Sequence, residues 1–288
     1  MDVAQSVTFW AAVVSYVAAF LLLSAGVLWK REGLARWARV VASAGVAAHA
    51  AAVVVRWVAA SHFPYVRNYE NLLVGTFCMA LAWVAASWRW RGLWPGGVLV
   101  LPFVLLTLGY ALTQPAELSP VTPPYQSAWL VVHVTFAWFT YASYSVVAGL
   151  AAAHLLRLRA EKKGAVQGLL ARIPPEKELG ELSMRLVAFG FLNNAVMIAS
   201  GAIWAYRLWG AYWRWDPVET WSLLTWLAYG FYMHARLTLR WSGKRLAWVA
   251  LFALFGVMMS FWGVQFAPTT YHLFQDIGGT LIETGRMR

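Results

Sequence analysis

The sequence predicts an all-α, polytopic membrane protein with about eight transmembrane helices and with both its N-terminus and its C-terminus outside. Two observations carry this prediction. The chain of 288 residues is 61% hydrophobic and only 12% charged, which excludes an ordinary soluble domain. Its apolar residues also gather into runs of roughly 20, about the length that an α-helix needs to cross ~30 Å of hydrocarbon.

Eight such runs follow one another along the chain. They cover residues 7–29, 38–60, 71–88, 94–112, 128–156, 184–208, 218–239 and 246–267. The first run follows a start, MDVAQSVTFW, that lacks the basic residues of a cleavable signal peptide, so we take it as a membrane helix.

Lysine and arginine residues set the orientation of these helices. Four connections hold 17 of the 23 basic residues, and short basic connections stay on the cytoplasmic side. They are residues 30–39, 88–93, 157–185 and 236–245. An even number of helices then places both termini outside, with the connections at 61–70, 113–127 and 209–217. The net charge of +11 is therefore mostly a topology signal, and it does not favour nucleic-acid binding.

A polar stretch with mixed charges and a Pro-Pro break divides the predicted helices into five and three. We expect a first five-helix membrane bundle at 1–156, a cytoplasmic linker at 157–185, and a three-helix membrane part with an outer segment and an outer tail at 186–288.

The outer segment WGAYWRWDPVETW, residues 209–221, is the most unusual stretch. Its second half predicts a helix start, because Asp216 stands before Pro217 and three residues before Glu219, the spacing of a capping box. Its aromatic residues exceed what an interfacial belt needs. They are Trp209, Tyr212, Trp213, Trp215 and Trp221, and Gly210 among them permits a close turn. Such a surface suits a large flat apolar ligand with a charged edge, such as a porphyrin, with Arg214 as a partner for a propionate.

Two histidines are predicted at the same membrane face as this segment. His133 lies about one and a half turns into the fifth predicted helix, and His272 follows the eighth. Two imidazoles presented from opposite sides are what a six-coordinate haem iron needs. The alternative is that each is an interfacial histidine hydrogen-bonded to backbone, and spacing alone leaves both possibilities open.

The other histidines have local explanations. His234 lies on the seventh predicted helix, about 24 Å from the outer end of that helix at 1.5 Å per residue. At this depth it either serves as a ligand in the inner half of the membrane or reaches the lipid headgroups. His154 lies at the same depth on the fifth helix, where an interfacial role is favoured. For His49 a buried hydrogen bond is favoured, and a role as a ligand on the inner side of the membrane is the reserve alternative. His62 is expected to anchor an outer loop.

The segment WGAYWRWDPVETW, followed by WLAYGFYMHARL, closely resembles the tryptophan-rich WWD signature of haem-handling proteins in cytochrome c biogenesis, and its D-P-x-E-T-W continuation is similar to the CcsA (ResC-type) branch. HFPYVRNYENLL resembles the family's G-H-F-P-x-S-N-x-Y-E-S segment, with Ser61 and Arg67 in place of the usual Gly and Ser, and Asn71 where a second Ser is expected. WLVVHVTFAWFTYAS and FWGVQFAPTTYHLF resemble the two segments that bear its outer histidines. The resemblance covers roughly residues 60–288.

The resemblance implies a protein that collects haem b from the cytoplasmic side, passes it through the membrane and presents it outside, where it is attached covalently to apocytochrome c. It implies His133 and His272 as the catalytic residues and axial ligands of the outer haem iron, and His234 as one ligand of an inner haem iron. The implied haem contacts in the outer segment are Trp209, Gly210, Tyr212, Trp213, Arg214, Trp215 and Asp216.

The family is implied to act as a cytochrome c haem lyase (holocytochrome c synthase) in a complex. A CcsB/ResB-like membrane subunit would supply the second inner ligand, unless His49 or His154 replaces it. The one cysteine, Cys78, lies in an apolar run and is expected to pack in the core, so the substrate must be reduced by a separate thiol-reducing pathway. The expected location is a bacterial plasma membrane, with attachment on the outer, periplasmic face.

Two other functions stay open. A membrane cytochrome b-like electron-transfer subunit would hold haem between two histidines at equal depth, for which His154 and His234 are available. An exporter of another amphipathic molecule would need no pair of outer histidines.

Overall fold

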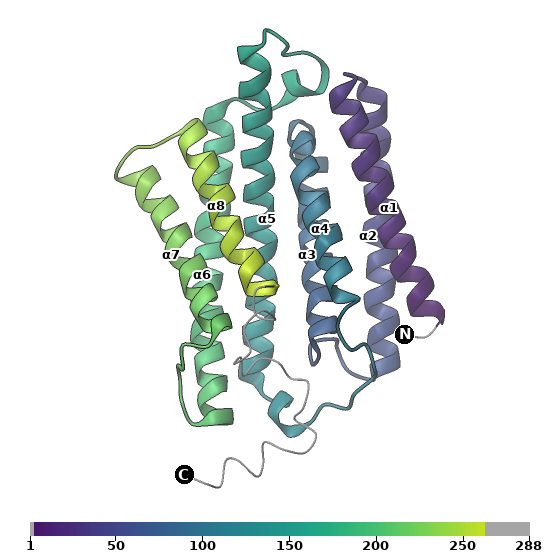
Figure 1. The fold of residues 1–288 in the computed structure, drawn as a ribbon, viewed down its shortest axis with the longest axis vertical. Helices are drawn as coiled ribbons and strands as arrows, with labels where there is room; N and C mark the ends of the chain where they lie inside the picture. The colour runs from purple at the N-terminus through teal and green to yellow at the C-terminus, as the bar shows by residue number, and fades with distance from the viewer. Residues whose placement is uncertain (1–2, 263–288) are drawn as a thin grey trace.

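The computed structural model describes residues 3–262, so the predicted ligand His272 lies outside the described residues. Within this part of the chain, eight α-helices run up and down in one bundle and no strand occurs (Figure 1). They are α1 (Val3–Leu28), α2 (Glu32–Ala60), α3 (Asn68–Arg89), α4 (Gly97–Ala111), α5 (Ala128–Lys162), α6 (Glu176–Trp209), α7 (Pro217–Leu237) and α8 (Gly243–Phe261). Three short 3-10 helices join them, η1 (Arg91–Gly96), η2 (Pro123–Tyr125) and η3 (Gly168–Arg172).

Seven of the described helices are long and apolar enough to cross a membrane, with η1 and α4 forming one span. The remaining helix, α7, has 21 residues, but its tryptophans, tyrosines and polar ends lower its hydropathy. It still traverses the bundle, because α6 ends and α8 begins at opposite ends (Figure 1). The predicted all-α, polytopic membrane architecture is confirmed, and the chain is an integral membrane protein.

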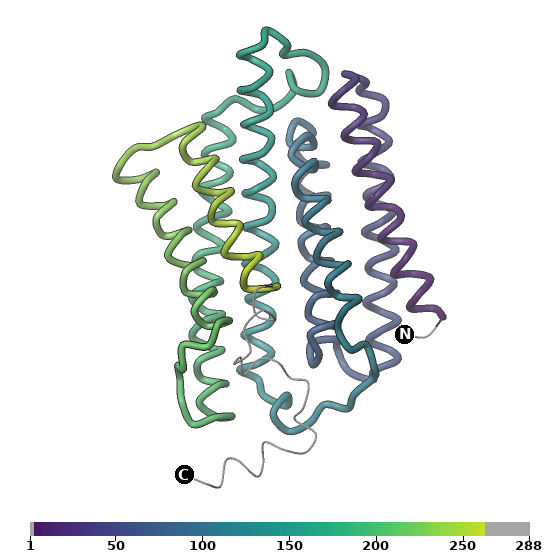
Figure 2. The backbone as a smooth tube through the Cα atoms, viewed as in Figure 1, coloured from purple at the N-terminus to yellow at the C-terminus, as the bar shows by residue number. Residues whose placement is uncertain are grey.

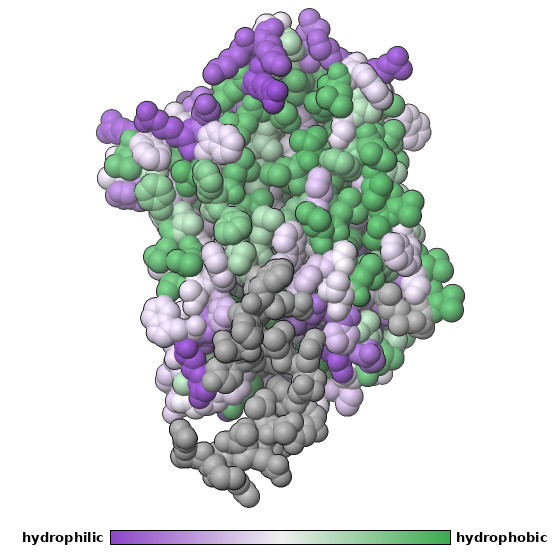
Figure 3. All heavy atoms as spheres, in the orientation of Figure 1, coloured by the Kyte–Doolittle hydropathy of each residue, from purple (hydrophilic) through white to green (hydrophobic). Residues whose placement is uncertain are grey.

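The two ends of the bundle differ in chemistry. We call one the basic end; it holds the connections 29–31, 90–96, 163–175 and 238–242. The other, the aromatic end, holds the connections 61–67, 112–127 and 210–216. In Figure 3 polar residues gather at the basic end, above a broad apolar band. This is the distribution that the positive-inside rule predicts for a cytoplasmic basic end.

Only part of the predicted linker at 157–185 lies between helices. Helix α5 continues to Lys162 and α6 already begins at Glu176, which leaves only residues 163–175 between them. Glutamate, lysine and arginine are good helix formers, so both helices extend past their apolar parts. Helix α6 begins directly after Pro174 and Pro175, because proline interrupts the hydrogen bonds of a helix interior.

Helix α5 is the central helix. It packs against α3, α4, α6 and α8, and Figure 2 shows it between the α1–α4 group and the α6–α8 group. Every residue from 140 to 151 is buried. Gly149 makes close packing possible, because a Cβ there would lie 2.3 Å from the Trp83 ring of α3. The centrality of α5 matters because this helix carries His133.

A buried ion pair fixes the aromatic end of α1–α4. The Arg56 guanidinium of α2 lies 2.9 Å from Glu70 Oε1 of α3, and both side chains are 1% exposed. Arg56 also donates to the carbonyl oxygens of Ala116 (2.6 Å) and Glu117 (3.0 Å). Glu70 Oε2 accepts from the backbone N–H of Val66 at 2.9 Å. Buried charges need this many partners, so Glu70 of the HFPYVRNYENLL segment has a structural role.

Candidate functional site

His133 is half-buried near the start of α5, at the aromatic end. Its Nδ1 lies 2.7 Å from the carbonyl oxygen of Met197 in α6. A carbonyl oxygen only accepts hydrogen bonds, so Nδ1 carries the proton and donates it. In a neutral ring Nε2 is then the nitrogen without a proton, and this is the form in which imidazole binds a metal.

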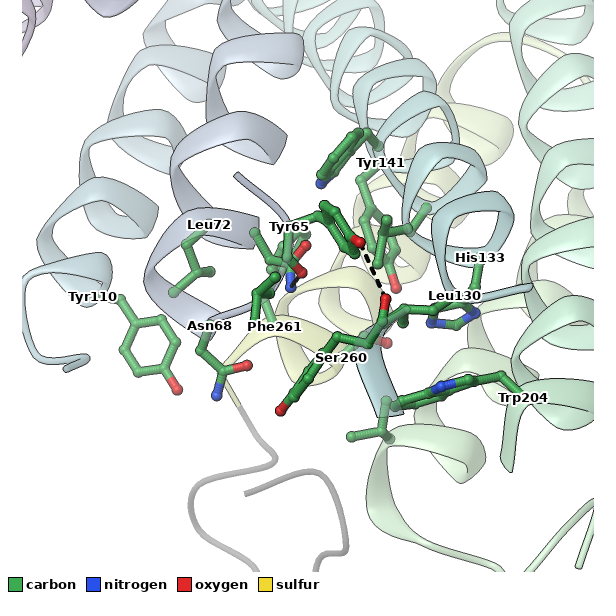
Figure 4. Close-up of a pocket in the computed structure, with 17 residues that line it drawn as sticks. Tyr65, Asn68, Leu72, Tyr110, Leu130, His133, Tyr141, Trp204, Ser260 and Phe261 are labelled. Carbon is green, nitrogen blue, oxygen red and sulfur yellow. Dashed lines mark hydrogen bonds between the residues drawn. The ribbon is translucent and has the colours of Figure 1, made fainter. Parts of the chain in front are cut away.

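His133 borders two cavities. The larger encloses about 980 Å³, part of it open to the surroundings, among residues of α3, α4, α5 and α8, with Trp204 of α6 and Val218 of α7. Figure 4 shows His133 and Trp204 on one side of it and Asn68 and Tyr110 on the other. The smaller encloses about 500 Å³ among α5, α6, α7 and the connection 210–216, which we call the tryptophan-rich connection. Trp213 lies in its wall. A ligand in either cavity would lie within reach of His133.

The wall of the larger cavity is aromatic with polar tips. Burial raises the pKa of the Tyr125 phenol to about 12, while burial and then the nearby Glu70 carboxylate raise the pKa of Tyr65. Both phenols therefore stay neutral and act as hydrogen-bonding groups at physiological pH. The Tyr65 hydroxyl donates to the Tyr125 carbonyl oxygen at 3.1 Å, which joins the connections 61–67 and 112–127.

The tryptophan-rich connection begins with a tight turn at the end of α6. Gly210 has φ +71° and its N–H donates to the Tyr206 carbonyl oxygen, which confirms the predicted close turn. Tyr212 stacks on Tyr206 with ring centroids 4.3 Å apart. Trp213 and Trp215 meet edge to face at 5.8 Å. The connection is therefore a packed aromatic surface, of which Trp213 reaches a cavity while Trp215 is 70% exposed.

The charged residues of this connection start α7. Asp216 is 4% exposed and accepts from the Val218 N–H at 2.8 Å, while Glu219 Oε2 accepts from the Asp216 N–H at 3.2 Å. The predicted capping box is confirmed. The Arg214 guanidinium donates to the Trp209 carbonyl oxygen at 2.7 Å. These bonds hold the connection in shape, and the haem contacts expected of Arg214 and Asp216 stay predictions.

The histidines at the basic end do not face each other. His154 is buried in α5 and lines a cavity that Tyr232 of α7 also lines. Residues two apart on a helix point about 200° apart, and His234 is exposed on the outer surface of α7. The pair of facing histidines that a cytochrome b-like subunit needs is therefore not formed by His154 and His234.

His49 and His62 have structural partners. His49 is fully buried, with Nε2 3.0 Å from the Leu73 carbonyl oxygen and Nδ1 3.3 Å from the Tyr16 hydroxyl. Both ring nitrogens are engaged, as the favoured hydrogen-bonding explanation expects. His62 Nε2 lies 3.1 Å from the Ser119 carbonyl oxygen, which confirms that His62 anchors an outer loop. Cys78 is a free thiol packed against the core, as expected.

Three residues beside His133 were not singled out by the sequence. Trp204 lines both cavities and donates to the Pro124 carbonyl oxygen at 3.0 Å. Met197 supplies the carbonyl that His133 contacts, and Gly201 lies against the imidazole ring. Only the isolated glycine in the apolar pattern of α6 gave a local signal, because glycine weakens a helix and marks close approach.

Comparisons with known proteins agree on one family. The protein-family model described as Cytochrome C assembly protein matches residues 65–272 of this chain. The Cytochrome c biogenesis protein CcsA of Guillardia theta is 30% identical over 236 residues, which are 75% of this chain and 78% of that protein. The same-named protein of Parasynechococcus marenigrum is 32% identical over 248 residues, 76% of this chain and 80% of that protein. That of Chlamydomonas reinhardtii is 34% identical over 226 residues, 76% of this chain and 63% of that protein.

The fold is shared with a solved structure. The protein titled Cytochrome c Heme Lyase CcmF superposes with a TM-score of 0.68 at 16% sequence identity. The match covers 90% of this chain and 46% of that one, so this chain spans about half of CcmF. At this identity the likeness concerns the helix arrangement alone.

Proposed function

We propose that the chain attaches haem b covalently to apocytochrome c. The chain belongs to the cytochrome c assembly protein family and takes part in cytochrome c biogenesis, which supports this proposal. It would act as the haem-presenting subunit of a cytochrome c haem lyase. The site would face the outer side of a bacterial plasma membrane, which the basic character of the opposite end supports.

The observation that carries the proposal is the setting of His133. Its Nδ1 donates to the Met197 carbonyl oxygen, which leaves Nε2 as the nitrogen that would bind a metal in the neutral ring. The ring borders cavities of about 980 and 500 Å³, and the smaller has Tyr212 and Trp213 of the tryptophan-rich connection in its wall. An imidazole ligand beside aromatic walls is what a porphyrin iron requires.

The chain's own residues would hold and orient the porphyrin. His133 would be one axial ligand and His272 the other, while Trp213 and Tyr212 would pack against the ring. Bound haem supplies two vinyl groups, and each thiol of the substrate's C-x-x-C-H motif adds across one of them, its sulfur bonding to one carbon and its hydrogen going to the other. The protein contributes position and exclusion of competing reactions.

A second subunit would complete the inner site. His234 lies exposed on the outer surface of α7, and the engaged nitrogens of His49 remove one intrinsic candidate for the second ligand. A CcsB-like membrane subunit packed against α7 would supply that ligand. Because Cys78 is partly buried and packs against the core, the substrate thiols would have to be reduced by a separate pathway.

The test is a maturation assay in cells that lack other maturation systems. The chain is co-expressed with a CcsB-like subunit and a C-x-x-C-H reporter, and covalent haem on the reporter is measured. We expect His133→Ala and His272→Ala to abolish maturation and added imidazole to restore it in part. His49→Ala is the control, because both ring nitrogens of this buried histidine have protein partners, and the molecules that fold should mature the reporter.

The outcomes separate the alternatives. Normal maturation by His133→Ala would refute the proposal. Loss of haem from the membrane subunit in His154→Ala but not in His133→Ala would favour an electron-transfer subunit. A parent chain that exports a compound without any covalent haem on the reporter would favour the exporter.

A further inference from the structure

The imidazole of His133 lies directly against the backbone of α6. A Cβ built on Gly201 would be 2.6 Å from His133 Nδ1 and 2.9 Å from Cε1. Side-chain carbons do not approach ring atoms that closely in packed proteins, so any residue larger than glycine forces the ring to move. Gly201 therefore creates the notch in which the ring lies.

The same notch gives the ring its hydrogen bond. In an α-helix the N–H of residue 201 bonds to the carbonyl of residue 197, so the Met197 oxygen lies one turn before the notch. His133 Nδ1 approaches this oxygen to 2.7 Å. The missing Cβ at Gly201 and the carbonyl at Met197 thus act on one ring from one turn of α6.

We propose that Gly201 and the Met197 carbonyl form a seat that fixes the ring plane and the tautomer of His133, so that Nε2 is presented to its ligand. Both are positioning residues. The identity of the ligand as haem rests on the proposed function, whereas the seat follows from contacts within the chain. Groups that bond the second nitrogen of a metal-bound histidine orient the ring and tune its donor strength.

Other close glycines in the bundle serve packing. A Cβ on Gly190, also in α6, would meet the Tyr144 ring at 2.5 Å, and one on Gly149 would meet the Trp83 ring at 2.3 Å. Those neighbours are buried aromatic residues without a role in the site. At Gly201 all three nearest atoms belong to His133, which ties this glycine to the site residue alone.

The first experiment substitutes Gly201→Ala and measures the haem that copurifies with the full complex. We expect about 10- to 100-fold weaker retention of the outer haem, the usual effect of disturbing a group that orients a metal ligand. The remaining haem should show a changed absorption spectrum and reduction potential. The control is Gly109→Ala on α4, where a Cβ has nothing within 4 Å and where haem content and spectrum should match the parent.

The second experiment is a double-variant cycle that does not depend on haem. Thermal unfolding of the purified protein is measured for Gly201→Ala with His133 intact and in a His133→Ala background. The added methyl should lower the midpoint only when the imidazole is present, because the shortened side chain leaves space for it. Should Gly201→Ala fail to fold alone, recovery of a folded protein in the His133→Ala background supports the seat in the same way.

The two proposals fail differently. If His133→Ala keeps the outer haem and its spectrum, the proposed function is wrong, while the unfolding cycle still tests the seat. If His133→Ala loses the haem but Gly201→Ala keeps parental content, spectrum and potential, the seat is wrong and the function stands. Equal destabilisation by Gly201→Ala in both backgrounds also overturns the seat.

Discussion

Two polar groups at the aromatic end show opposite uses of polarity in a membrane protein. The Arg56–Glu70 pair is 1% exposed and its charges are bonded on every side. His133 is half-buried, with one nitrogen on a backbone carbonyl and cavities beside the ring. A polar group in the bilayer is retained for structure or for a ligand. The space beside the group distinguishes the two.

Breaking the structural pair should have the largest effect on stability. Glu70→Ala leaves the Arg56 charge buried without its carboxylate, and such a loss costs about 3–5 kcal/mol. It also removes the acceptor for the Val66 N–H at the start of α3. We expect a strongly lowered unfolding midpoint in detergent, or too little folded protein to purify.

The control lies in the same region. Glu117 pairs with Arg67 at 3.8 Å through a side chain that is 74% exposed, so Glu117→Ala should change stability by less than about 1 kcal/mol. Arg56 contacts only the backbone oxygen of Glu117, which the substitution keeps. If the two variants unfold alike, the buried pair is not what fixes this end of the bundle.

Local patterns were sufficient for the fold and for part of the site. Apolar run length gave the eight helices, since each run must cover the hydrocarbon. The spacing of Asp216, Pro217 and Glu219 gave the start of α7, since a cap involves neighbours in sequence. His133 became a candidate because histidine is rare in apolar helices and its depth follows from residue number; its role as a ligand stays a prediction.

Contacts between helices were beyond those patterns. His49 and His133 look alike in sequence, as single histidines among alanines, valines and aromatics. Only the packed bundle puts the Tyr16 hydroxyl and the Leu73 carbonyl on one ring and cavities beside the other. The notch at Gly201 and the pairing of Arg56 with Glu70 likewise depend on which helices become neighbours.

These two histidines give the next prediction. His49→Ala removes a buried ring, leaves the Leu73 carbonyl and the Tyr16 hydroxyl without this partner, and should cost about 2–3 kcal/mol. The outer haem spectrum should be unchanged in the molecules that fold. His133→Ala should do the reverse, with a small change in unfolding midpoint and loss of the haem. Equal loss of haem in both variants would contradict this division between structural and ligand-binding histidines.

Two tryptophans of the tryptophan-rich connection should differ in their effect on haem retention. Trp213 lines the smaller cavity, whereas Trp215 is 70% exposed and adopts φ +59°. An aromatic contact is worth about 0.5–1.5 kcal/mol beyond its buried area, so Trp213→Ala should lower haem retention by up to about tenfold. Trp215→Ala should have a smaller effect. Haem titration of the purified variants measures both, and a larger loss in Trp215→Ala would place the ligand on the exposed side of the connection.

The smallest effect is expected at the helix cap, where shape and binding separate most clearly. Asp216→Ala removes the acceptor for the Val218 N–H and should cost about 1 kcal/mol, the typical value of an N-cap. Asp216→Asn should be nearly neutral, because asparagine caps a helix about as well. Haem retention should follow stability across the parent, Asn and Ala proteins. An Asp216→Asn protein that unfolds like the parent but binds no haem would show that the carboxylate itself contacts the ligand, and that the cap and the site share one residue.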